Sequence, residues 1–148
     1  MLLLFYGFSS YTTTIPGTWD KYLVLDYNES SGMVGEHRSY KITSDTLYFK
    51  EKKNQQKETV FKHMLSQNDL NNLLLILRIN SVDKIKLKKY GYILYDGGAF
   101  SLQMKHKNDY IFNISNSAYE GLRDSDRIPF EKIVTAIKKL KEKKDEGY

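Results

Sequence analysis

Apolar and polar residues alternate along much of the first 65 residues, which is the period-two spacing of β-strands that bury one face. In the segment 46–51, for example, Leu47 and Phe49 share a face. Gly, Asn, Asp and Ser residues separate the alternating segments and are typical of turns. The pattern predicts an antiparallel meander of four strands, over residues 21–27, 36–42, 46–51 and 57–65.

The hydrophobic period changes at Ser66, where a helix is predicted. Ser66 occupies an N-cap position, and Asp69 three residues later completes a capping box. Leu65 and Leu70 flank this cap at the spacing of a hydrophobic staple. The apolar stripe that follows has helical spacing and consists of Leu70, Leu73, Leu74 and Leu77. We therefore expect a buried helix over residues 66–78.

Alternation returns in the second half of the chain, before a second helix. Strands are predicted over residues 90–95, 99–105 and 110–114, and the dipeptide Asp96-Gly97 favours a tight hairpin turn. Pro129 fits the first position of a helix, where its missing N–H costs no hydrogen bond. The apolar residues that then recur at helical spacing are Phe130, Ile133, Val134, Ile137 and Leu140. The second helix is expected over residues 129–144.

These elements predict an α+β fold. We expect an antiparallel sheet of about six or seven strands in two meanders, with two amphipathic helices packed on one face. The length of 148 residues is that of one domain with one core. Residues 17–148 are predicted to form this single domain, and residues 1–16 an apolar N-terminal segment and linker.

The apolar run over residues 1–8 is too short to span a bilayer, so no transmembrane span is expected. It is similar to the hydrophobic part of a secretory signal, but it has no basic flank before it. Three interpretations stay open: a remnant of an export signal, a first strand, and a hydrophobic segment that packs on the domain. The first favours an exported or cell-envelope location over the cytoplasm.

The polar residues do not gather into a catalytic or metal-binding motif. There is no cysteine, and His37 and His63 have no second histidine at ligand spacing. Ser101, His106 and Asp109 come nearest to a nucleophilic triad, but Ser101 and His106 end the same strand about 16 Å apart, at about 3.3 Å per residue. We therefore expect no metal, no cofactor and no enzymatic activity.

Charge and aromatic content suggest binding instead. The net charge is +5, and the chain holds 12 tyrosines, which offer rigid contact area with a polar tip. Lysines and tyrosines gather around the predicted strand 90–95, and this strand would display both if it lay at a sheet edge. The predicted binding surface consists of Lys84, Lys86, Lys88, Lys89, Tyr90, Tyr92 and Tyr95.

The tripeptide Gly17-Thr18-Trp19 resembles the Gly-x-Trp opening of lipocalin-like barrels. That resemblance implies a tryptophan closing one end of a barrel that holds a small apolar ligand. The leucine-rich helix predicted after the fourth strand departs from an eight-stranded up-and-down barrel. The alternative is a lone Trp19 that anchors the first strand in the core, and the interrupting helix favours this alternative.

Three functions follow from these observations. The first is a non-enzymatic protein-binding module, of the inhibitor or immunity-protein kind, that occludes an acidic partner with a basic, tyrosine-bearing surface. The second is a small apolar-ligand or lipid binder with a lipocalin-like cavity. The third is a nucleic-acid-binding domain, which the lack of base-stacking motifs disfavours.

Overall fold

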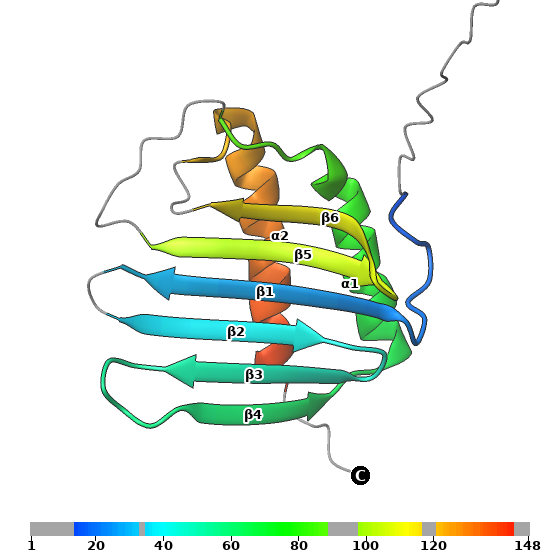
Figure 1. The fold of residues 1–148 in the computed structure, drawn as a ribbon. Helices are drawn as coiled ribbons and strands as arrows, with labels where there is room; N and C mark the ends of the chain where they lie inside the picture. Colours follow the sequence, from blue (N-terminus) through cyan, green and yellow to red (C-terminus); the bar gives the residue numbers. More distant parts are fainter. Residues whose placement is uncertain (1–13, 33–34, 89–97, 117–120, 144–148) are drawn as a thin grey trace, which may run out of the picture.

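The computed structural model describes residues 14–32, 35–88, 98–116 and 121–143, which form one antiparallel sheet and two α-helices (Figure 1). The strands are β1 (Leu23–Ser31), β2 (Glu36–Ile42), β3 (Thr46–Lys52), β4 (Thr59–Met64), β5 (Ala99–His106) and β6 (Asp109–Asn116). The helices are α1 (Gln67–Ile79), the short 3₁₀ helix η1 (Val82–Lys84) and α2 (Asp124–Glu142). The predicted α+β fold is confirmed.

The strands lie in the order β4-β3-β2-β1-β5-β6, and every neighbouring pair is antiparallel. The first four form the predicted meander, because short turns join consecutive strands. The hairpin of β5 and β6 then adds to the free side of β1, which places the first strand inside the sheet (Figure 1). Strand 90–95 and the turn Asp96-Gly97 were predicted within residues that lie outside the described part of the chain.

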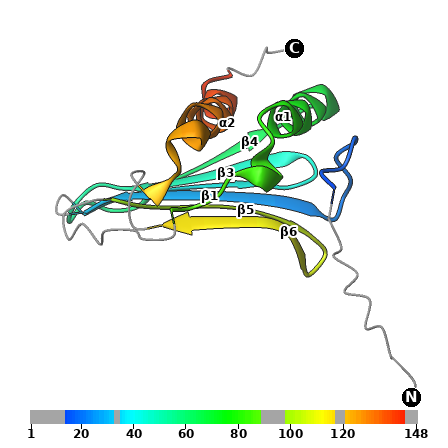
Figure 2. The same ribbon diagram turned by 90° about the horizontal axis from the view of Figure 1, so that it is seen from above.

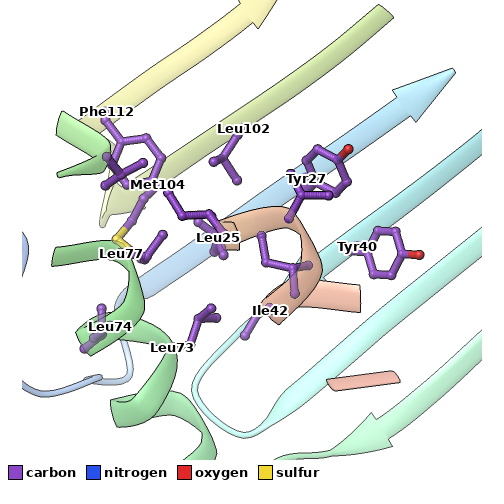
Figure 3. Packing of buried hydrophobic residues seen from close by; sticks show 14 of the residues in the cluster. Leu25, Tyr27, Tyr40, Ile42, Leu73, Leu74, Leu77, Leu102, Met104 and Phe112 are labelled. Atoms are coloured by element: carbon purple, nitrogen blue, oxygen red, sulfur yellow. The ribbon is translucent and has the colours of Figure 1, made fainter. Parts of the chain in front are cut away.

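Both helices cover the same face of the sheet, as Figure 2 shows. This face buries the apolar half of each alternating strand, including Leu25, Ile42 and Leu102. From α1, Leu73, Leu74 and Leu77 pack against these strands (Figure 3). The other side of the sheet, which we call the open face, has no helix over it among the described residues (Figure 2).

The helix α1 begins as its sequence predicts. Ser66 is the N-cap, its Oγ accepts a hydrogen bond from the backbone N–H of Asp69 at 3.1 Å, and the Asp69 carboxylate accepts one from the N–H of Ser66. Leu65 and Leu70 on either side of this cap are both buried. The cap satisfies backbone donors that a helix start would otherwise leave unpaired.

The helix α2 begins five residues before the predicted Pro129. Asp124 and Asp126 lie in its first turn, where negative charge is favourable near the helix N-terminus. Asp126 also accepts hydrogen bonds from the backbone N–H of Lys86 at 3.0 Å and from Arg123 Nε at 2.6 Å. These contacts fix the helix start, so Pro129 lies within the helix, where it cannot donate the usual backbone bond.

Trp19 anchors the segment before β1 on α1. Its side chain is buried, its backbone N–H donates to Asn71 Oδ1 at 3.1 Å, and its carbonyl accepts a bond from Gln67 Nε2 at 3.0 Å. The sheet is open between β4 and β6, so the six described strands do not close into a barrel. The interpretation of Trp19 as a core anchor is thus confirmed.

Candidate protein-binding surface

The open face carries cross-strand rows of mostly polar side chains. Its central row crosses all six strands, because each member is the register partner of the next. From β4 to β6 this row is Lys62, Tyr48, Lys41, Asp26, Gln103 and Asn113. Side chains opposite one another on neighbouring strands lie close enough to interact. The sheet therefore assembles a continuous surface from residues distant in sequence.

The open face is strongly basic. Among the described strand residues on this face, the lysines are Lys41, Lys50, Lys52, Lys62 and Lys105, and the one carboxylate is that of Asp26. Four of these lysines are exposed, and Lys105 is partly exposed. Much of the chain's net charge of +5 is thus displayed on one flat surface. A surface with this charge attracts negatively charged molecules.

Two tyrosines add aromatic contact area to the lysines. The Nζ of Lys62 lies 5.6 Å from the ring centroid of Tyr48, and the Nζ of Lys105 lies 4.4 Å from that of Tyr110. These are cation–π distances, so each ring helps to position its lysine. Both rings stay exposed. They can therefore pack on a partner, a role in which tyrosine is enriched at interfaces.

The middle of the open face is slightly hollowed. A depression of about 420 Å³ lies between β1, β2 and β3. Its lining consists of Asp26, Ser39, Lys41, Thr43, Tyr48 and Lys50. Hydroxyl groups and ammonium groups dominate this lining, so it offers hydrogen-bond donors to a carboxylate side chain.

The helix side of the sheet carries a contrasting cluster in which the charges neutralise one another. Glu29 accepts hydrogen bonds from Tyr27 Oη and Lys138 Nζ, each at 2.8 Å, and from Arg38 Nη1 at 3.4 Å. Arg38 Nε donates to Glu51 at 2.7 Å. Each charge faces an opposite charge, so the cluster holds α2 on the sheet.

These contacts change the acidity of the cluster. Burial opposes the ionisation of Glu29, but the hydrogen bonds from Lys138 and Tyr27 outweigh it and lower the pKa of this carboxyl. The hydrogen bond from Arg38 likewise lowers the pKa of Glu51. Burial, together with the negative charge of Glu29, raises the pKa of Tyr40 to about 12. The two carboxylates therefore stay charged and paired near neutral pH.

The surface predicted from the sequence is described only in part. Lys89, Tyr90, Tyr92 and Tyr95 lie outside the described residues. Lys84, Lys86 and Lys88 are exposed and lie on η1 and the segment after it, beside the start of α2. Lys88 pairs with Asp124 at 3.4 Å, and Leu87 forms an isolated bridge with Leu122. These three lysines therefore lie beside the start of α2, next to this bridge.

The open face was missed in the sequence because its members are far apart along the chain. Lys41, Tyr48 and Lys62 are neighbours only after β2, β3 and β4 pair in register. The available signal was the recurrence of lysine at alternate strand positions, as at Lys50 and Lys52. The prediction instead chose the lysines after residue 83, because they are close together in the sequence.

A second concave feature lies between α1 and α2. It is a groove of about 710 Å³ whose floor includes Leu73, Ile76, Ala136 and Leu140. An ion pair between Asp69 and Lys143 lies at one end. The groove is apolar below and polar at its rim, where exposed lysines from α2 lie.

The comparisons with known proteins place the chain in no family. No protein-family model matches it, and no curated protein matches it either. In the described part of the chain, no helix has the length and apolar character needed to span a membrane. The same residues include no group of three or more His, Asp or Glu side chains placed to hold a metal ion.

Proposed function

We propose that the protein is a non-enzymatic protein-binding module, of the inhibitor or immunity-protein kind, that occludes an acidic partner. The open face is the contact surface. The observation that carries this proposal is the charge distribution of the sheet, with five lysines and one carboxylate on the described open face. The acidic groups of the opposite side are held in ion pairs under α2.

The shape of the face suits a protein more than a small molecule. Six strands give a broad surface, and its central depression of about 420 Å³ has room for a side chain. Lysines at the rim of a contact speed association, whereas tyrosines at its centre contribute more of the binding energy. Tyr48 lies in the central row between Lys41 and Lys62, where both effects combine.

The test is to isolate the partner and map the contact. The tagged protein is purified from its source cells, any stoichiometric partner is produced separately, and the Kd is measured by isothermal titration calorimetry. The double variant Lys41→Glu/Lys50→Glu should weaken the complex at least tenfold without changing the melting temperature. The matched variant Lys86→Glu/Lys88→Glu makes the same charge change on the surface predicted from sequence.

Comparison of the two double variants shows which surface contacts the partner. The chemical nature of the partner tests the proposed function. Weakening by Lys41→Glu/Lys50→Glu alone supports the open face. Weakening by the matched variant alone moves the contact to the lysines beside α2. A partner that proves to be nucleic acid, with affinity that falls steeply as salt increases, would contradict the proposal.

The groove between the helices supports a second candidate, the binding of a small apolar ligand with an anionic head. Its apolar floor would hold the chain, and Lys132 and Lys139 at its rim would attract the head. Native mass spectrometry of the purified protein should then show a retained lipid. The variant Ala136→Trp, which fills the groove, should release that lipid.

A further inference from the structure

The edge strand β4 has one side that pairs with no described strand, and it carries exposed apolar side chains. It is the last strand in the sheet order, so β3 pairs with one side of it and no described strand pairs with the other (Figure 1). Every second backbone N–H and C=O group of such a strand points away from the sheet. Those groups can accept a further strand from another molecule.

Among the described residues, Lys62 is the one feature of β4 that protects a sheet edge, and the strand has neither a bulge nor a covering element. Its pairing with β3 continues without a bulge from Thr46–Met64 to Glu51–Thr59, and it contains no proline. At the opposite edge, η1 packs against β6, and a bulge interrupts the pairing of β5 with β6. Proteins use cover and bulges of this kind to prevent strand addition.

The side chains of β4 are also unusually exposed for apolar residues. Val60 is 61% exposed and Met64 is 59% exposed, and both lie on the open face. Phe61, on the helix side, is 39% exposed and stacks on His63. The side chains of an added strand could pack against these apolar residues on both faces of the sheet.

The lysines on and near β4 favour an added strand of opposite charge. Lys62 projects between Val60 and Met64 on the open face, and Lys50 and Lys52 follow on β3. A second copy of this chain paired through its own β4 would bring two basic open faces together, and like charges there repel. An extended segment with acidic residues on the same face would instead pair with these lysines.

We propose that β4 receives an extended acidic segment of the partner protein, which adds to the sheet as a further antiparallel or parallel strand. Backbone hydrogen bonds to β4 provide the attachment, and acidic side chains that alternate with apolar ones provide the specificity. This inference rests on the proposed function and adds the mode of docking. It places the partner's strand beside Lys62, at one end of the open face.

The test uses a synthetic ten-residue peptide of alternating valine and glutamate as the probe, with blocked ends. Binding is measured by NMR titration, together with hydrogen exchange of the protein's amides. We expect at least tenfold slower exchange for outward-pointing amides of β4 and little change in β6. A peptide of alternating glycine and glutamate has the same charges but a weak strand preference, so it should bind at least tenfold more weakly.

Two charge variants show whether the edge itself is responsible. Lys62→Glu should weaken binding of the valine–glutamate peptide at least tenfold. Lys105→Glu makes the same change on the same face four strands away, and it should alter the affinity by less than twofold. Melting temperatures of both variants confirm that the sheet is intact.

Several results would overturn the inference. These are peptide binding without protection of β4 amides, equal effects of Lys62→Glu and Lys105→Glu, and equal binding of a single-stranded oligonucleotide at β4. Protection of β4 that rises with protein concentration alone would assign the edge to a second copy. A native complex that depends on Lys41 and Lys50 but leaves β4 exchange unchanged would end this inference and leave the proposed function standing.

Discussion

The substitution Glu29→Gln tests whether the ion cluster under α2 stabilises the fold. Glu29 is nearly buried, with 14% of its side chain exposed, and it accepts hydrogen bonds from Tyr27, Lys138 and Arg38. Glutamine has almost the same shape and keeps one carbonyl acceptor, so the packing of α2 stays close to that of the wild type. The change therefore removes the negative charge and one of the two acceptor oxygens, with little change of shape.

The expected cost follows from the contacts that lose this charge. A hydrogen bond to a charged group contributes about 1 kcal/mol more than a neutral one. The bonds from Tyr27 and Lys138, both 2.8 Å long, are affected most. Arg38 is 3.4 Å away and keeps its shorter bond to Glu51, and Lys138 is partly exposed to screening solvent. We expect a loss of about 1.5 kcal/mol at pH 7, or roughly 3–6 °C in Tm.

The pH dependence has a definite sign. Because the folded pKa of Glu29 is lowered from its ordinary value of 4.5, the unfolded chain binds this proton more readily. The stabilisation by Glu29 is therefore complete above pH 4.5 and is lost as the pH falls through the folded pKa. The difference between wild type and Glu29→Gln should be largest at pH 7 and should shrink as the pH falls below 4.5.

The assay is urea unfolding followed by circular dichroism at pH 7, 5, 4 and 3. Glu58→Gln removes one charge from an exposed position and should change the free energy of unfolding by less than about 0.5 kcal/mol. Equal stabilities of wild type and Glu29→Gln at pH 7 would refute the reasoning. A gap that stays constant down to pH 3 would refute its electrostatic basis.

Three further substitutions test the helix α1 by urea unfolding at pH 7. Ser66→Ala removes the acceptor for the Asp69 N–H and should cost about 1 kcal/mol, and an unchanged stability would contradict the capping assignment. Leu74→Ala empties a fully buried site and should cost about 3–4 kcal/mol, whereas Leu75→Ala, at a 45% exposed site on the same helix, should cost under about 1 kcal/mol. Similar losses for the two leucines would contradict the orientation of α1.

The elements were predictable from the sequence where local chemistry determines them. Strand alternation depends on the two-residue period alone, and the start of α1 depends on Ser66 and Asp69, which are three residues apart. The start of α2 was misplaced because Pro129 is a strong local signal for a first turn. The actual start depends on contacts of Asp126 with Lys86, 40 residues earlier in the chain.

The candidate surface could not be predicted in the same way. Its central row exists only because β1 to β4 pair in one particular register, and a shift of one residue would turn Lys41 and Tyr48 towards the core. The lysine-rich segment that includes Lys84 and Lys86 was conspicuous because its charges are adjacent in the chain. Adjacency across strands requires knowledge of the pairing.

The central place of β1 has a consequence for synthesis on the ribosome. Asn28 on β1 bonds to Ser101 on β5, and these residues are 73 positions apart. Until β5 emerges, the meander of the first four strands exposes β1 as an additional free border, with apolar side chains on one face. Contacts of this separation close slowly. Before β5 is synthesised, the sheet of the nascent chain therefore has two unpaired edge strands, β1 and β4. We expect chaperone binding to be most useful before residue 106 leaves the exit tunnel.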